Sequence, residues 1–386
     1  MSDKITCQLC QAETHTIKLH LEREHPEHTV DTYQSLFPDA PLLSLTAEQA
    51  IAKRRQELLA SKTEAAGMTS NVSVLPTVDR QEAMHERFGL GSAQIARNAR
   101  GEGIPITVRG SSDWDRLIPD IDNDFVWDIE MLKNGLMGVE LNIPTMIWGH
   151  AGTGKTVFWE QVCARTNRPV IRVQHTINTE EDHVLGHWVV RSGQTVYEPG
   201  PLTRAMLYGW TYLADEYDFG MPSVLSVYQP VLEGKPLVIK DADEKHMIVR
   251  PHPHFRFVAT GNTNGSGDDT GLYQGTSLQN AANYSRFGIT HQAKYLSPEQ
   301  ETLVIQRRAS VSERDARALV DWANAIRRSF EGGESTMTVG PRELIYAAKL
   351  GARKASFRAG VQLAVTNRWS TVDREVGDQL AQRHLA

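Results

Sequence analysis

The sequence predicts an α/β protein whose core is a parallel β-sheet with helices on both faces, together with a small N-terminal module and a C-terminal helical region. Three observations support this fold class. From about Gly101 onward, short apolar runs alternate with helical stretches. The apolar run that begins at Ile143 breaks into a glycine-rich loop and then into a helix-compatible segment. Near the N-terminus, two cysteines and two histidines have the spacing of a metal-bound module.

The N-terminal module contains four potential zinc ligands in C-x2-C-x9-H-x4-H order, which are Cys7, Cys10, His20 and His25. Four such side chains suit tetrahedral zinc. A helix from about Thr14 would place both histidines on one face with Ile17 and Leu21, which form a minimal apolar core. Because so short a segment could hardly fold without the metal, residues 1–40 are predicted to form a C2H2-type zinc finger. The alternative is a helical leader with incidental histidines.

The charge of this module bears on what it binds. Between Ser2 and Val30, three Lys or Arg residues stand against five acidic ones. This balance is a poor match to phosphate, so docking to a protein is favoured over the reading of DNA.

Residues 41–80 are predicted to form a helix and a polar linker. The helical periodicity begins at Thr46, a suitable N-cap, and carries a basic cluster at Lys53–Arg55 that is typical of a solvated face. From Ser61 to Asp79 the residues are small and polar, as in a linker.

The loop after the first strong apolar run has the pattern of a nucleotide-phosphate loop. Residues Ile143–Thr156 read IPTMIWGHAGTGKT, in which the spacing G-x-x-x-x-G-K-T is fully met. The glycines let backbone N–H groups turn inward, Lys155 reaches the β and γ phosphates, and Thr156 places a hydroxyl on Mg²⁺ at a helix start. The predicted nucleotide-binding residues are Gly149, His150, Ala151, Gly152, Thr153, Gly154, Lys155 and Thr156. A chance glycine-rich turn is disfavoured by the strand before the loop and the helix after it.

Two later segments extend this site. In WTYLADEYD an apolar run ends in Asp215 and Glu216, the arrangement in which the aspartate holds Mg²⁺ and the glutamate polarises the attacking water. An acidic loop after a buried strand is the alternative. In FRFVATGNTNGSGD a buried strand over Phe255–Thr260 would deliver Asn262 beside the γ-phosphate. Asparagine before glycines is also ordinary turn chemistry.

The rest of the chain is divided into an α/β domain over 81–295 and a helical lid over 296–386. Within the α/β domain, HWVVRSGQTVYEPGP and LVIKDADEKHMIVR have apolar runs that flank turn residues, so both are predicted to be projecting β-hairpins. Arg342 follows Gly340-Pro341 and would open a helix of the lid. Arg286 precedes an aromatic residue that could anchor its backbone. A surface ion pair is the alternative for either arginine.

Composition limits the classes of protein. The chain has 386 residues, of which 40% are hydrophobic and 23% charged, so it can form two or three globular domains. No uninterrupted apolar stretch approaches the ~20 residues of a membrane span, and a cytoplasmic location is expected. The three cysteines indicate a metal site in a reducing compartment rather than a disulfide framework. A net charge of −6 gives no support to extensive nucleic-acid binding.

The phosphate loop, LADEYD, the run from Arg250 to Thr276, SRF and GPREL resemble the CobS-type ATPase subunits of aerobic cobaltochelatase, in the MoxR-like branch of AAA+ proteins. The resemblance covers roughly residues 104 to 370. It implies a hexameric ring, a partner with a metal-ion-dependent adhesion (VWA) domain, and a large chelatase subunit that inserts Co²⁺ into a corrin ring. It also implies that Asn262 is sensor 1, Arg286 the finger that reaches the neighbouring subunit's site, and Arg342 sensor 2. By the same resemblance the hairpins are the helix-2 insert and the pre-sensor hairpin.

The first forty or so residues resemble instead the zinc finger of the bacterial Ros/MucR regulators, which bind DNA. This finger and the linker are departures from the cobaltochelatase family. The sequence therefore predicts an ATP-hydrolysing, ring-forming AAA+ motor that remodels a client. Its zinc finger is predicted to dock a partner. A DNA-directed ATPase and a regulatory nucleotide switch with little turnover are the alternatives.

Overall fold

The computed structural model describes residues 3–26, 29–38, 40–47, 78–268, 272–273, 275–276 and 278–385. The predicted helix from Thr46 and the linker from Ser61 to Asp79 lie for the most part outside these residues. The chain divides into two compact units, Met1–Leu75 and Pro76–Ala386.

In the first unit, a short antiparallel pair precedes a helix. Strands β1 (Ile5–Thr6) and β2 (Glu13–Thr14) pair so that Ile5 lies opposite Thr14. The helix α1 (Ile17–Glu24) therefore begins three residues later than the sequence indicated, because Thr14 belongs to a strand. A second helix, α2 (Val30–Leu36), starts with a Thr29–Thr32 capping box. The buried core of the unit is Cys7, Ile17, Leu21 and Tyr33.

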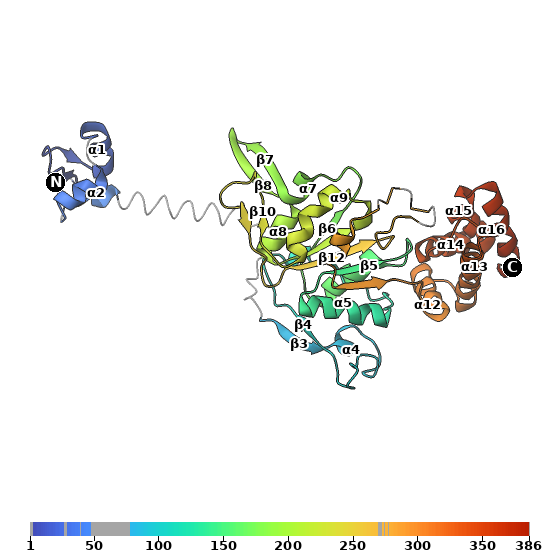
Figure 1. Ribbon diagram of the computed structural model, residues 1–386. Coiled ribbons are helices and arrows are strands. Elements are labelled where there is room, and N and C mark those ends of the chain that lie inside the picture. The colour runs from blue at the N-terminus through green and yellow to red at the C-terminus, as the bar shows by residue number, and fades with distance from the viewer. Residues whose placement is uncertain are drawn as a thin grey trace. The chain divides into compact units, whose positions relative to one another are not determined.

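The second unit is built around a five-stranded sheet in the order β13-β5-β12-β9-β6. Three of its strands, β5, β6 and β12, are labelled in Figure 1. All its neighbouring strands are parallel. The strands are β5 (Thr145–Trp148), β6 (Val170–Gln174), β9 (Thr211–Asp215), β12 (Arg256–Gly261) and β13 (Ile289–Gln292). Every residue of β9 is buried, since helices cover both faces of the sheet. The predicted α/β fold is confirmed.

Separate apolar clusters fill the two faces. One contains Trp159 of α6 and Leu136 of α5, and the other contains Met206 of α8 and Tyr228. The helices of the α/β part are α4 (Met84–Arg87), α5 (Ile129–Leu141), α6 (Lys155–Arg165), α7 (Glu181–Leu185), α8 (Pro201–Tyr208), α9 (Pro222–Leu225), α10 (Gln229–Leu232) and α11 (Ala281–Tyr284).

In the described part of the second unit, three antiparallel strand pairs lie outside the main sheet. Strand β3 (Arg80–Ala83) pairs with β4 (Pro105–Val108). The first predicted hairpin forms from β7 (Gly186–Arg191) and β8 (Gln194–Pro199), and it projects from the body of the unit in Figure 1. The second forms from the shorter strands β10 (Leu237–Val238) and β11 (Ile248–Val249). Both hairpin predictions are confirmed.

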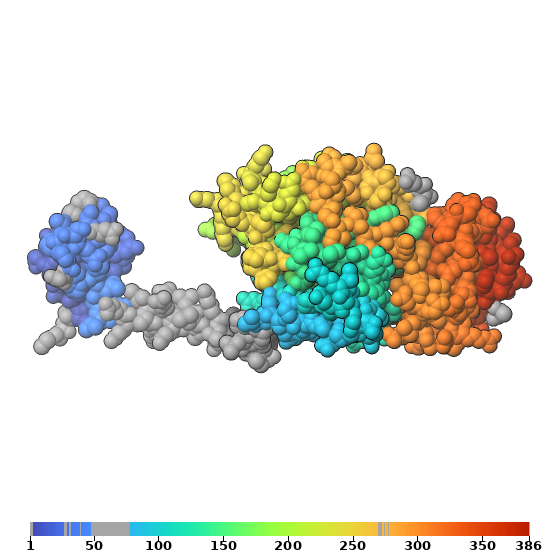
Figure 2. All heavy atoms as spheres, turned by 60° about the horizontal axis from the view of Figure 1, so that its bottom comes forward, coloured from blue at the N-terminus to red at the C-terminus, as the bar shows by residue number. Residues whose placement is uncertain are grey.

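The lid consists of α12 (Pro298–Ala309), α13 (Glu313–Glu331), α14 (Pro341–Lys354), α15 (Phe357–Ala364) and α16 (Thr371–His384). It has an apolar core of its own, in which the Trp322 indole donates a hydrogen bond to the Gly377 carbonyl at 3.1 Å. In the space-filling view the C-terminal helices pack directly against the α/β part (Figure 2). Among the described residues, no helix is both long and apolar enough to cross a membrane.

Candidate functional site

The glycine-rich loop joins β5 to α6 and has a backbone that requires glycine. Gly149, Gly152 and Gly154 have φ values of +146°, +83° and +85°, in the left-handed region that other residues rarely adopt. At Gly149 an added Cβ would lie 2.3 Å from the Ala293 carbonyl oxygen of the neighbouring strand's end. The loop therefore approaches the sheet closely, and α6 begins at Lys155 with its N-terminal amides toward the loop.

Lys155 lies folded over the loop. Its ammonium donates to the carbonyls of Gly149 at 2.6 Å and His150 at 3.0 Å, and to the Asn262 side-chain oxygen at 3.2 Å. Burial lowers the pKa of Lys155 to about 8. A phosphate group at this point would supply the counter-charge that the buried ammonium needs.

Asp215 lies at the carboxyl end of β9, next to the loop. Its carboxylate accepts hydrogen bonds from Thr156 Oγ1 at 2.8 Å and Thr260 Oγ1 at 2.5 Å, and it pairs with Arg172 Nε at 2.7 Å. The four strands that carry these residues or lead into them, β5, β12, β9 and β6, are consecutive in the sheet, so their carboxyl ends meet. The hydroxyl of Thr156 and the carboxylate of Asp215 are oxygen ligands of the kind that Mg²⁺ prefers, so these residues fit the ion.

Glu216 follows in a left-handed conformation, with φ of 52°. Its backbone N–H donates to Thr260 Oγ1 at 3.1 Å, and its carboxylate accepts a hydrogen bond from Gln174 Nε2 at 2.7 Å. Glu216 lines the same small cavity as Lys155 and Asn262. It is therefore placed where a general base for an attacking water would be needed.

The turn that carries Asn262 is fixed by a buried acid that sequence reasoning did not single out. Asp218 Oδ2 accepts hydrogen bonds from the backbone N–H groups of Asn262 and Thr263, both at 2.8 Å, and from Thr263 Oγ1 at 3.0 Å. Burial raises the pKa of the Asp218 carboxyl, which the three hydrogen bonds oppose.

The two predicted arginines lie in different places. Arg342, at the start of α14, lines the cavity of about 90 Å³ that also holds Lys155, Thr156, Asp215, Glu216 and Asn262. Arg286 does not line it, and instead donates to Glu233 Oε1 at 2.7 Å and to the Ala282 carbonyl. The structure thus brings Arg342 together with Lys155, Thr156, Asp215, Glu216 and Asn262 within one subunit, whereas Arg286 lies apart from them.

A larger cavity of about 350 Å³ adjoins the phosphate loop on the side of the lid. Its lining includes Phe125, Val157, Ile345 and Tyr346, and it shares Gly152, Gly154 and Arg342 with neighbouring cavities. Apolar and aromatic walls of this kind suit the flat face of a nucleobase. These residues have no motif spacing, so they could not be identified from the sequence.

Two polar residues of β6 were also missed. Arg172 contacts Asp215, and Gln174 contacts Glu216. They stand two positions apart in the strand sequence VIRVQ, so both project on one face. Alternating polar residues in an otherwise apolar strand were the signal that could have identified them.

In the N-terminal unit, the four predicted zinc ligands converge. One ligand atom from each of Cys7, Cys10, His20 and His25 lies within 4.8 Å of all the others, and Cys10 Sγ is 3.1 Å from His20 Nε2. Two sulfur and two imidazole donors at this separation fit tetrahedral zinc.

Comparisons with known proteins agree with this geometry. Residues 144–287 match the model of the AAA domain (dynein-related subfamily), and residues 301–383 match the CbbQ/NirQ/NorQ C-terminal model. The chain is 33% identical over 259 residues to the aerobic cobaltochelatase subunit CobS of a Sinorhizobium species, which covers 64% of this chain and 77% of that protein. It is 24% identical to the protein NorQ of Paracoccus denitrificans, over 58% of this chain and 79% of that protein.

A third relative is the mouse von Willebrand factor A domain-containing protein 8, which is 26% identical over 146 residues, or 35% of this chain and 8% of that protein.

The two family models and the similarity to CobS and NorQ show that the chain belongs to the CobS family of AAA+ proteins, in the group that includes NorQ, and that it is an ATPase.

Proposed function

We propose that this ATPase is a ring-forming motor, in which the site described above is completed by an arginine from the neighbouring subunit. The observation that supports this most directly is the position of Arg286. The cavity contains a lysine, two acids, an amide and Arg342, whereas Arg286 lies elsewhere, next to Glu233. An arginine supplied across an interface stabilises charge that develops on the γ-phosphate. A hexameric ring, as the family resemblance implies, would place such an arginine at every site.

Within each subunit the roles follow from the contacts. The phosphate loop and Lys155 would hold the phosphates, and Thr156 and Asp215 would hold Mg²⁺, which would neutralise phosphate charge. Glu216 takes the proton from the attacking water, and Asn262 orients that water through its amide. Arg342 lies in the first turn of α14, a helix of the lid. Its contact with the phosphates would therefore couple nucleotide binding to the position of the lid.

We assign the N-terminal unit to docking through a zinc finger held by Cys7, Cys10, His20 and His25. The convergence of these four side chains supports the metal. The excess of acidic over basic residues from Ser2 to Val30 favours a protein surface as its target over DNA.

The partner is proposed to carry a VWA domain. CobS is named as a subunit of aerobic cobaltochelatase, and another relative is named for its von Willebrand factor A domain. We further propose that the ATPase acts on a large chelatase-like subunit, whose substrates would be cobalt and a corrin ring. Because the zinc finger is a departure from the cobaltochelatase family, the alternative is that the ATPase has been recruited to a different client.

The test is stimulation of ATP turnover by candidate partners. The full chain, tagged and purified from its native host, should retain a VWA-domain protein, and adding that protein to the purified ATPase should raise turnover. A variant with Cys7 and Cys10 changed to Ser should lose retention of the docked partner. Stimulation by DNA, without any effect of the VWA-domain protein, would favour the DNA-directed alternative and overturn this proposal.

A further inference from the structure

We propose that His150 is a positioning residue for nucleotide binding, whose side chain joins the phosphate loop to the lid. His150 follows the first glycine of the loop, at a position where the G-x-x-x-x-G-K-T pattern accepts any residue. The pattern therefore uses its backbone and leaves the imidazole without a role. The inference rests on the proposed role of the loop in holding the nucleotide.

The imidazole of His150 is enclosed by aromatic rings. It lies parallel to the ring of Tyr295, with an interplanar angle of 4° and 5.9 Å between centroids. Phe330, near the end of α13, meets it edge-on at 6.1 Å and 86°. Tyr295 precedes the lid and Phe330 belongs to it, so His150 connects the loop to the lid by ring contacts.

The remaining side of the imidazole is held by a hydrogen bond. The Tyr273 hydroxyl accepts from the backbone N–H of Ala151 at 2.9 Å and lies 3.0 Å from His150 Nδ1. Burial raises the pKa of Tyr273 to about 12, so its proton is available to His150. Burial, and secondarily the charge of Lys155, lower the pKa of His150 and keep its Nδ1 able to accept that proton. One hydroxyl thus fixes two consecutive residues of the loop.

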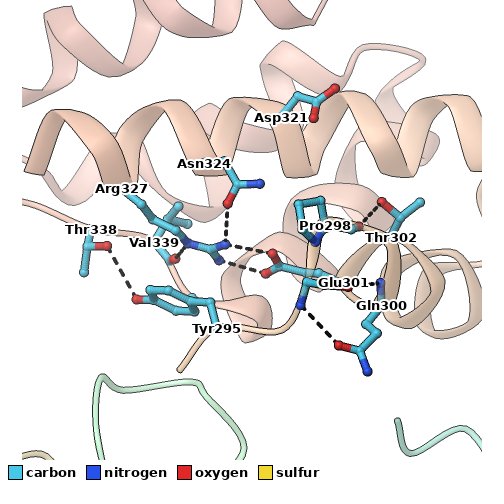
Figure 3. Close-up of polar contacts among 12 residues, drawn as sticks. Tyr295, Pro298, Gln300, Glu301, Thr302, Asp321, Asn324, Arg327, Thr338 and Val339 are labelled. Atoms are coloured by element: carbon cyan, nitrogen blue, oxygen red, sulfur yellow. Dashed lines mark hydrogen bonds and ion pairs between the residues drawn. The ribbon is translucent and has the colours of Figure 1, made fainter. Parts of the chain in front are cut away.

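Tyr295 is itself fixed by a buried ion pair of the lid (Figure 3). The Arg327 guanidinium lies over the Tyr295 ring at 3.7 Å from its centroid, and it forms two hydrogen bonds of 2.7 Å to the Glu301 carboxylate. The side chains of Arg327 and Glu301 are only 6% and 0% exposed. Arg327 Nε also donates to the Val339 carbonyl at 3.0 Å, in the segment that leads into α14. The surface against which His150 stacks is therefore rigid.

The backbone of His150 transmits this restraint to the phosphate-binding groups. Its carbonyl accepts hydrogen bonds from Lys155 Nζ at 3.0 Å and from Thr153 Oγ1 at 2.8 Å. When the imidazole is fixed, the carbonyl that orients Lys155 is fixed too. A loop that is already ordered loses less conformational freedom when a nucleotide binds. Loss of the imidazole should therefore weaken the binding of ATP and of ADP to the same extent, with little effect on turnover at saturating ATP.

The experiment compares three substitutions of His150 in the full chain. His150→Ala removes the ring and the acceptor, His150→Phe keeps a ring for stacking, and His150→Asn keeps an acceptor for the Tyr273 hydroxyl. We expect about tenfold weaker binding of ATP and ADP for the alanine variant and about threefold for each of the others, from the size of one stacking contact and one neutral hydrogen bond. The kcat should stay within about twofold.

His384→Ala is the matched control, because none of the described ring contacts or hydrogen bonds joins that histidine to the phosphate loop. A second measurement places His150→Ala in a Tyr295→Leu background, where the stacking partner is already gone. There the additional loss of affinity should shrink to about threefold, since the two side chains act as one contact.

Nucleotide dissociation constants within about twofold of the unaltered protein for His150→Ala would overturn the inference, as would full additivity with Tyr295→Leu. A fall in kcat with unchanged affinity would also overturn it, because it would show a role in the chemical step. If the unaltered protein binds no ATP, the proposed function fails as well, whereas equal binding by the unaltered protein and His150→Ala defeats only this inference.

Discussion

Replacement of Glu216 by Gln should separate nucleotide binding from hydrolysis. The two side chains have the same shape, and Gln174, which donates to Glu216 at 2.7 Å, can also donate to an amide oxygen. The described hydrogen bonds of Glu216 join it to Gln174, Thr260 and Phe219, and none goes to the phosphate loop. The substitution should therefore leave the loop, Lys155 and Asp215 in place. What it removes is a carboxylate that can take a proton from water.

The expected loss follows from that single change. A positioned general base typically contributes ~10²–10⁴ to the rate, so turnover should fall at least about 100-fold, which corresponds to ~2.7 kcal/mol of activation free energy. The dissociation constant for ATP should stay within about threefold, because the phosphate contacts remain. Lys155→Ala should show the opposite pattern, in which ATP binding itself is weakened, since it deletes the ammonium that faces the phosphates.

The measurement is a single-turnover assay with labelled ATP, combined with equilibrium binding of ATP to each variant. Glu313→Gln, an exposed acid in the first turn of α13, is the matched control and should hydrolyse at the parental rate. Hydrolysis by Glu216→Gln at the parental rate would refute the assignment of the base. A loss of ATP binding equal to that of Lys155→Ala would refute the separation of roles.

Three further outcomes are expected. Protein prepared without chelator should carry about one zinc per chain. Changing Cys7 and Cys10 to Ser should abolish zinc binding while sparing basal ATPase activity. Absence of zinc from the unaltered protein in metal analysis would contradict this. Arg286→Ala should hydrolyse poorly at saturating ATP, and mixing it with Lys155→Ala should recover part of the activity, whereas full activity of a monomeric preparation would exclude a shared site. Because burial lowers the pKa of Lys155 to about 8 and a bound polyphosphate favours the charged amine, ATP affinity should be flat below about pH 7 and fall above about pH 8. Calorimetry at several pH values tests this, with Lys155→Ala expected to lose the dependence.

The sequence predicted those parts of the site that depend on local patterns. The turn of the phosphate loop requires Gly149, Gly152 and Gly154 at fixed spacing, and all three adopt positive φ. Asp215 could be placed because a short, mostly apolar run of strand length ends at it, and in the structure that run is the buried strand β9. Such features are set within a few residues of chain, so they can be read without knowledge of the tertiary structure.

The missed residues depend instead on which strands are neighbours. In the sheet, β6 lies beside β9, and the register pairs Gln174 with Asp215 and Arg172 with Leu213. Only this register brings the side chains of Arg172 and Gln174 to the two acids. The helix α1 was predicted to begin too early for a similar reason, since Thr14 is taken by a strand pair with a residue nine positions before it. Periodicity alone cannot show that competition.

The polar groups of the site are already engaged with one another, and this determines how a nucleotide can bind. The ammonium of Lys155 is bonded to two loop carbonyls, and Asp215 is shared by two hydroxyls and Arg172. Phosphate oxygens and a divalent cation must exchange with these contacts, so affinity is a difference between two sets of interactions. The side chain of Arg172 is 47% exposed, whereas that of Asp215 is 2% exposed, so the arginine can turn toward water while the acid stays. Asp215 would then keep its place and its charge for the cation, and the exchange would require movement of a side chain rather than of the sheet.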